Sequence, residues 1–337
     1  MAANNLHRPT KSEWVLKPQS RTLSSAMWAA AKVAAGLQNV RGNCCSEGFA
    51  ILMYHRVAEH IKGLAAPTLN VTPDQLRRQI SGLNDRGFEC WPLSKLVAAK
   101  AESRPIPANA YAITFDDGFE NNHSNAWPIL RELNASATIF LSTEYLDTDQ
   151  PFPFDTWSEA GSTTAPPSSW RPLTTTQCQE MLDSGVIELG AHTHSHRRFV
   201  GRTNAYIADM QQCLGVLRER FGIVRPTFAF PYGESNTELV EATRNLDVSC
   251  AVTVRQRRVL PNDDVFQWGR LNVDSFDTPA MLAGKLSGWY PSFVVAGKAV
   301  MRPLDMMSRV SRRLRRSYSQ HAPKFDGTLT RNAPSQS

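Results

Sequence analysis

Short apolar segments rich in strand-forming residues alternate with helical patterns from residue 50 to residue 290 of the chain. The predicted strands are Ala50–Tyr54, Ala112–Phe115, Ala137–Leu141, Val186–Leu189, Thr227–Phe230, Ser249–Thr253 and Arg270–Val273. Strands that alternate with helices are typical of βα units, in which consecutive strands join one parallel sheet. The pattern therefore predicts an α/β fold whose mainly parallel sheet is either closed or doubly wound.

Helical signals lie between these strands. The clearest helix begins at Pro73, with Thr72 as the N-cap and Gln75 in the capping-box position, and it ends at Gly87. The other predicted helices are Asn125–Leu133, Thr176–Leu182, Asn204–Phe221, Thr237–Leu246 and Pro279–Leu286. One segment, Asp147–Ser169, is rich in Pro, Ser and Thr and predicts a long loop of the kind that borders substrates.

Two extensions flank the α/β region, which we place at residues 48–290. In the N-terminal extension, residues 1–47, the apolar stretch Met27–Leu37 is interrupted by Lys32 and predicts a short amphipathic helix rather than a secretory signal. We therefore expect a cytoplasmic or membrane-peripheral protein, with secretion or the cell envelope as the alternative. The C-terminal extension, residues 291–337, is predicted to be a basic, partly disordered tail.

Composition places the chain among folded proteins, since 42% of its residues are hydrophobic and 20% are charged. The net charge of +6 comes from one stretch, because Lys298–Arg316 holds seven basic residues and one acid. The rest of the chain is balanced in charge, which gives no support for nucleic-acid binding. Apolar residues interleave with the arginines of this stretch, so it is either a helix that contacts an anionic membrane surface or a solvated tail.

The six cysteines are too few for a scaffold built from disulfides. Four of them stand singly among apolar or helical residues, as buried thiols do: Cys90, Cys178, Cys213 and Cys250. The adjacent pair Cys44–Cys45 lacks the second pair that a zinc knuckle needs, and we assign it no role.

Four predicted strands end in polar or turn residues. The residues that follow them are His55, then Asp116-Asp117-Gly118, then His192-Thr193-His194-Ser195-His196, and finally Pro231-Tyr232-Gly233. The carboxyl ends of parallel strands lie on one face of the fold, so these residues are expected to converge there. The sequence therefore predicts a functional site at that face.

The Asp pair and the histidine cluster have the residue types of a metal-dependent hydrolase. The side chains of Asp116 and Asp117 diverge, so one carboxylate can bind a cation while the other acts as a base. Alone, this pair would also suit a solvated turn. His192 and His196 are four residues apart, a spacing that recurs in zinc sites, and His194 then points away from them.

Together, Thr114–Gly118 and His192–His196 resemble the first two motifs of the polysaccharide deacetylases, carbohydrate esterase family 4 with the NodB homology domain. The resemblance covers residues 50–275. It implies a distorted (β/α) barrel of about seven parallel strands, a divalent metal that is most commonly Zn²⁺, and removal of acetyl groups, most commonly N-acetyl, from a polysaccharide or oligosaccharide. The opening Ile51–Val57 resembles the poly-β-1,6-N-acetylglucosamine deacetylase branch, which implies a circularly permuted barrel.

The same resemblance implies roles for individual residues. Asp117, His192 and His196 would hold the metal, Asp116 would be the general base, and His55 would be the general acid. Pro231 and Tyr232 belong to the third motif, which borders the substrate and whose Tyr amide helps to hold the oxyanion. Ala229 stands where the family commonly has an arginine that supports the catalytic Asp, and Arg270 is expected either to replace it or to form a structural ion pair.

Two other functions fit these residues. A related metal-dependent amidohydrolase would act on a small non-sugar amide; aromatic loops favour a sugar, unless Trp127, Trp157 and Trp170 lie in the core. A catalytically silent, glycan-binding relative is the other alternative. The substitution of Ala229 favours it slightly, whereas the complete set of Asp and His residues argues against it.

Overall fold

The strands that the sequence predicts come together in one parallel sheet of eight strands. The computed structural model describes residues 48–64, 67, 69–155 and 165–288. Within them the strands of this sheet are β1 Ala50–Tyr54, β4 Glu89–Cys90, β5 Ala110–Phe115, β6 Ala137–Leu141, β7 Ile187–Ala191, β8 Thr227–Ala229, β9 Cys250–Val252 and β10 Leu271–Asn272. The order is β10-β1-β5-β6-β7-β8-β9, with β4 paired to β5. A separate parallel pair consists of β2 (Arg56–Val57) and β3 (Asn70–Val71).

The sheet curls until its two edges meet. Trp268 forms a parallel bridge with Val252 of β9. A few residues later the same segment enters β10, where Leu271 is in register with Leu52 of β1. Hydrogen-bonded contacts therefore run from β9 through residues 268–272 to β1, as in the distorted (β/α) barrel that was predicted.

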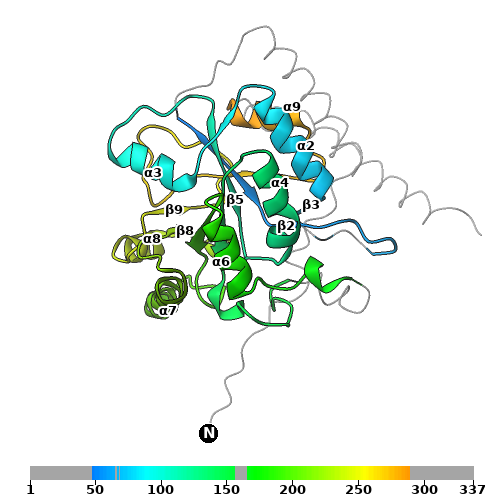
Figure 1. The fold of residues 1–337 in the computed structure, drawn as a ribbon. Helices are drawn as coiled ribbons and strands as arrows, with labels where there is room; N and C mark the ends of the chain where they lie inside the picture. The colour runs from blue at the N-terminus through cyan, green and yellow to red at the C-terminus, as the bar shows by residue number, and fades with distance from the viewer. Residues whose placement is uncertain (1–47, 65–66, 68, 156–164, 289–337) are drawn as a thin grey trace, which may run out of the picture. The chain divides into compact units, whose positions relative to one another are not determined.

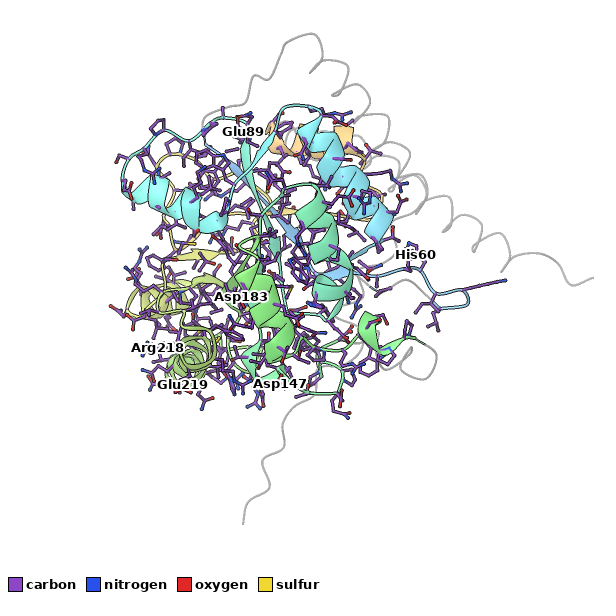
Figure 2. The ribbon with its side chains drawn as sticks, viewed as in Figure 1. His60, Glu89, Asp147, Asp183, Arg218 and Glu219 are labelled. Atoms are coloured by element: carbon purple, nitrogen blue, oxygen red, sulfur yellow. The ribbon has the colours of Figure 1, made fainter. Side chains whose placement is uncertain are left out.

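Helices cover the outside of this sheet (Figure 1). The longer ones are α2 Pro73–Asn84, α3 Leu93–Ala101, α4 Trp127–Glu132, α6 Thr175–Asp183, α7 Thr203–Phe221, α8 Thr237–Arg244 and α9 Pro279–Leu286. The short ones are η1 Asn122–Ala126, a π-helical turn that leads into α4, and the 3₁₀ turns η2 Thr143–Tyr145, η3 Pro167–Ser169 and η4 Pro231–Gly233. Charged side chains such as Asp183, Arg218 and Glu219 lie on the exposed faces of α6 and α7 (Figure 2).

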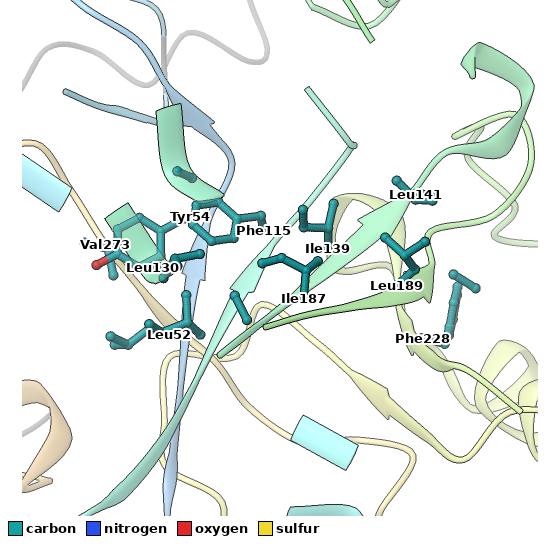
Figure 3. Close-up of a cluster of buried hydrophobic side chains, with 14 of the residues drawn as sticks. Leu52, Tyr54, Phe115, Leu130, Ile139, Leu141, Ile187, Leu189, Phe228 and Val273 are labelled. Atoms are coloured by element: carbon teal, nitrogen blue, oxygen red, sulfur yellow. The ribbon is translucent and has the colours of Figure 1, made fainter. Parts of the chain in front are cut away.

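Alternating residues of each strand divide the core into two clusters, because successive side chains of a strand point to opposite faces. Leu52 of β1 belongs to the larger cluster, which packs the sheet against the helices together with Ile139 and Leu189 (Figure 3). Its neighbour Ile51 belongs to the second cluster, which includes Trp268. Most strand side chains on both faces are thus apolar, and polar side chains at the carboxyl ends of the strands line the site.

Local signals in the sequence predicted these elements well, and the capping box of α2 is present between Thr72 and Gln75. The helix ends at Asn84 rather than at Gly87, because Gly87 adopts a left-handed conformation (φ 75°) in the turn that follows. The helix α3 was not predicted. Its N-cap residue is Pro92, which makes no side-chain capping hydrogen bond. The sequence before Leu93 therefore lacks the residues that usually mark the start of a helix.

Several predictions lie outside the described residues: the helix at Met27–Leu37, the pair Cys44–Cys45 and the basic stretch Lys298–Arg316. Of the remaining cysteines, three are buried free thiols and Cys90 is half-buried, as expected. Among the helices that the structure describes, none combines the length and the apolar character needed to cross a membrane.

Candidate active site and metal centre

The carboxyl ends of four strands surround one open cavity of about 240 Å³. Because β1, β5, β7 and β8 are parallel members of one sheet, the residues that follow them reach the same end of the barrel. Fourteen residues line the cavity: Met53, His55, Arg56, Leu69, Asp116, Asp117, Phe119, Phe154, Asp155, His192, His196, Phe230, Tyr232 and Val254. The convergence that the sequence predicted is therefore present in the structure.

Three buried side chains at this cavity have the geometry of a metal-binding set. The Nε2 atoms of His192 and His196 lie 3.4 and 3.3 Å from Oδ1 of Asp117. One ligand atom from each residue lies within 4.8 Å of the others. Burial would raise the pKa of Asp117, but the two neighbouring imidazoles hold it well below its usual range. A carboxylate and two imidazoles that converge in this way fit a divalent cation such as Zn²⁺.

The loops that carry this site turn sharply. Asp117, Thr193, His196 and Tyr232 have positive φ angles of 74°, 63°, 52° and 57°. Residues other than glycine adopt this region rarely, and those that do cluster at functional sites. These turns follow directly on the ends of β5, β7 and β8, and they direct the side chains into the cavity.

A hydrogen bond sets the tautomer of His192. Its Nδ1 lies 2.8 Å from the carbonyl oxygen of Ala229, so Nδ1–H donates to that carbonyl and leaves Nε2 unprotonated. This arrangement is the usual one for a metal-binding histidine. Ala229 therefore contributes to the site through its backbone carbonyl. Its methyl side chain cannot take the role of the arginine that the resemblance led us to expect at this position.

Arg270 makes a two-point contact with Asp116. Its guanidinium donates to both oxygens of Asp116, at 2.5 Å to Oδ1 and 2.7 Å to Oδ2. Its Nε donates to the carbonyl of Thr253, and the whole side chain is buried. Burial would raise the pKa of Asp116, but the neighbouring guanidinium and His192 hold it below its usual value. Asp116 is thus an ionised carboxylate in a fixed orientation, next to the proposed metal ligands.

His55 also lies next to Asp116, with its Nε2 at 3.8 Å from Oδ2. Its backbone carbonyl accepts a hydrogen bond from Asn122, and Asn121 and Asn125 bond the backbone of Val57. Burial lowers the pKa of His55 despite the nearby carboxylates. These three asparagines were not predicted, since their only signal in the sequence is a polar run that begins three residues after the Asp pair.

Of the two residues of the third motif that were given a role, Tyr232 lines the cavity and Pro231 does not. Pro231 is buried at the start of η4. The ring of Tyr232 is 42% exposed and packs against His196, with ring centroids 4.6 Å apart. No hydrogen bond from the Tyr232 amide is present in the part of the chain that the structure describes, so this amide can donate to a substrate oxygen.

As the sequence predicted, His194 points away from the proposed metal ligands. Its Nδ1 lies 2.9 Å from the hydroxyl of Thr143, and its amide donates to Oδ1 of Asp209 on α7. The amide and the hydroxyl of Ser195 also donate to Asp209. Asp209 thus holds the histidine loop on α7. Sequence reasoning missed it because a single Asp within a predicted helix carries no signal of its own.

The aromatic residues at the cavity are not the tryptophans that the sequence singled out. Trp127 stacks on His123 and donates to Ser184, and neither it nor Trp170 lines the cavity; Trp157 lies outside the described residues. The cavity is instead lined by four other aromatic side chains: Phe119, Phe154, Phe230 and Tyr232. These four side chains come together at the cavity because of how the loops fold, and no local pattern in the sequence indicates that arrangement.

Comparison with known proteins shows which family the chain resembles. Residues 103–251 match the family model described as polysaccharide deacetylase. The matched range contains the Asp pair and the histidine loop, whereas His55 and Arg270 lie on either side of it.

Curated relatives of this chain carry the name of the branch that its opening motif resembles. The poly-β-1,6-N-acetyl-D-glucosamine N-deacetylase of Staphylococcus epidermidis is 23% identical over 220 residues, which cover 62% of this chain and 70% of the relative. The enzyme of the same name from Escherichia coli K12 is 24% identical over 227 residues. That alignment covers 59% of this chain but only 33% of the longer relative.

Two solved structures illustrate the shared fold. IcaB from Ammonifex degensii superposes with a TM-score of 0.60 and 21% identity, over 72% of this chain and 97% of that chain. The de-N-acetylase from Aggregatibacter actinomycetemcomitans superposes with a TM-score of 0.61 and 18% identity, over 71% and 100%. At these identities the likeness shows that this chain shares the fold of those structures.

Proposed function

We propose that this protein is a metal-dependent hydrolase that removes N-acetyl groups from a polysaccharide or oligosaccharide. One observation carries the proposal. A single cavity joins a buried two-histidine, one-aspartate set to a second carboxylate, Asp116, that Arg270 holds in a bidentate contact. A binding protein has no need of an oriented, ionised base next to a metal set, whereas a metal-assisted hydrolase does.

The residues would act as follows. A divalent metal held by Asp117, His192 and His196 would supply Lewis acidity, which makes water easier to deprotonate and polarises the acetyl carbonyl. Asp116 accepts the proton of the attacking water, because Arg270 keeps the carboxylate ionised and fixes its plane. The amide of Tyr232 donates to the carbonyl oxygen as negative charge develops there.

The leaving amine needs a proton, and His55 is placed to supply it. Its Nε2 lies at the cavity, 3.8 Å from Asp116, so the proposed base and the proposed acid share one cavity. The side-chain amide of Asn122 donates a hydrogen bond to the backbone carbonyl of His55, which fixes the backbone from which the imidazole extends. A general acid of this kind contributes on the order of a hundred- to ten-thousand-fold to the rate.

For the substrate we propose a β-1,6-linked N-acetylglucosamine polymer, on the strength of the names of the curated relatives. The rings of Phe119, Phe154 and Tyr232 give the cavity the partly apolar walls that suit the flat faces of sugar rings. The main alternative is a small non-sugar amide. The openness of the cavity between loops from several strands favours the larger substrate.

The test compares three substrates with zinc-loaded protein. Acetate release is measured from a β-1,6-linked N-acetylglucosamine pentamer, from the β-1,4-linked pentamer of the same sugar, and from acetanilide. We expect the β-1,6-linked pentamer to react fastest, and Asp116→Asn to lower the rate of release by about a hundred- to ten-thousand-fold. Release from acetanilide alone would support the small-amide hydrolase, and binding of a pentamer without any acetate would identify a silent relative.

A further inference from the structure

The two histidines of the metal-binding set are supported in different ways. The Nδ1 of His192 bonds the carbonyl of Ala229. The Nδ1 of His196 is buried and makes no hydrogen bond to any residue that the structure describes. Since metal-binding histidines almost always use this nitrogen to fix the ring, something else must orient His196.

Aromatic rings flank His196 in place of a hydrogen-bond acceptor. The ring of Phe154 stacks on the imidazole, with centroids 3.8 Å apart and an angle of 28° between the planes. The ring of Tyr232 meets it edge-on at 4.6 Å and 62°. Between these rings the imidazole is only 5% exposed.

Each of the two rings is itself held in place. Asp155, next to Phe154, forms an ion pair with the buried side chain of Arg56, and Phe152 packs against Phe154 at 5.0 Å. The guanidinium of Arg198 lies 4.0 Å from the centre of the Tyr232 ring. The rings therefore form a fixed slot for the imidazole rather than a loose contact.

We propose that Phe154 and Tyr232 are positioning residues that hold the imidazole of His196 in its metal-binding orientation by ring packing. This inference rests on the metal-binding set of the proposed function. A ring without a hydrogen bond would otherwise rotate about its side-chain bonds, and a metal would have to restrict that rotation on binding. The packed rings restrict the rotation of the His196 imidazole before a metal binds. The affinity for the metal therefore depends on Phe154 and Tyr232, which are not metal ligands.

The test measures metal affinity and does not depend on any substrate. Metal-free wild-type protein, Phe154→Leu, Phe154→Tyr and the matched control Phe276→Leu are titrated with Co²⁺, followed by absorbance, and their Zn²⁺ affinity is measured by competition with a chelator. Phe276 is exposed on the chain after β10 and does not line the cavity. We expect Phe154→Leu to weaken Zn²⁺ binding by about tenfold, the lower end of the range for loss of an outer-shell partner.

Phe154→Tyr keeps the stacked ring and is expected to restore wild-type affinity, and Phe276→Leu to leave it unchanged. The visible Co²⁺ spectrum of Phe154→Leu should also broaden or shift, because His196 is no longer held in one orientation. An unaltered affinity and spectrum in Phe154→Leu would overturn the inference. If circular dichroism shows that this variant is unfolded, Tyr232→Leu decides instead, since that ring is 42% exposed and its loss leaves the core intact. Absence of metal binding by the wild-type protein would instead reject the proposed function.

Discussion

Arg270 and Asp116 are 154 positions apart in the chain, yet the two terminal guanidinium nitrogens of Arg270 donate to the two carboxylate oxygens of Asp116. The contact joins the segment after β9 to the end of β5, and both side chains are buried. A planar, bidentate contact of this kind fixes the orientation of the carboxylate and keeps the carboxylate ionised.

The first prediction concerns the removal of this arginine. Arg270→Met leaves a buried carboxylate without its partner, so we expect a loss of about 3–5 kcal/mol in the free energy of unfolding. Activity should fall strongly while bound metal remains, because Asp117 and the histidines are untouched. Chemical denaturation, acetate release and metal analysis measure the three quantities.

The double variant Arg270→Met/Asp116→Asn serves as the control. It removes the unpaired charge together with the arginine, so most of the lost stability should return while activity stays absent. Equal instability of the single and double variants would show that packing of the arginine stem, rather than the ion pair, supports this region.

The second prediction separates the two neighbouring aspartates. Asp117→Asn should lose both metal and activity, because Asp117 is the carboxylate that lies 3.3–3.4 Å from both imidazoles. Asp116→Asn should keep its metal and lose activity by about a hundred- to ten-thousand-fold, as expected for a missing base. Metal content is measured after dialysis of both variants side by side, and equal metal loss in both would contradict the division of roles.

The third prediction concerns His55. His55→Ala should lower kcat for an N-acetylated sugar strongly while metal content stays normal. An activated acetyl ester, 4-nitrophenyl acetate, should be affected much less, since its leaving group departs without a proton. A parallel loss on both substrates would indicate that His55 shapes the site instead of acting as the acid.

The fourth prediction tests the anchor of the histidine loop. Asp209→Ala removes the acceptor for the amides of His194 and Ser195, which should cost about 1–3 kcal/mol of stability and weaken Zn²⁺ binding. Asp183→Ala on α6 is a suitable control, because that side chain is exposed and lies on the outside of the barrel (Figure 2). The melting temperature and the Zn²⁺ affinity of Asp209→Ala should both fall below those of the control.

The fifth prediction concerns the basic stretch Lys298–Arg316, for which we propose peripheral contact with anionic membranes. Deleting residues 298–337 should spare turnover of a soluble oligosaccharide and weaken binding to vesicles that contain phosphatidylglycerol. Co-sedimentation at low and high salt measures that binding. A tail that remains solvated would show the same sedimentation with and without the deletion.

Local patterns were sufficient to predict most strands and the residues that follow them. The Asp pair and the histidine loop were found because each is contiguous and ends a β-rich run. Arg270 could only be suggested, since its contact with Asp116 depends on how the sheet curls across 154 positions. Asp209 was missed for a related reason: its role arises from packing between a helix and the histidine loop, which leaves no periodic trace in the sequence. Phe154 stands in the loop that was expected to border the substrate and does line the cavity, but its stacking on His196 depends on how that loop folds.

The pairing of β10 with β1 has a consequence for synthesis of the protein. The first strand of the barrel can complete its hydrogen bonds only after residues 271–272 have left the ribosome, because its partner on one side is the last strand. Non-local pairings of this kind form late, after the loop between them has closed. His55 emerges among the first residues of the domain and Arg270 among the last, so a nascent chain halted before β10 would carry every proposed metal ligand and still lack a supported base.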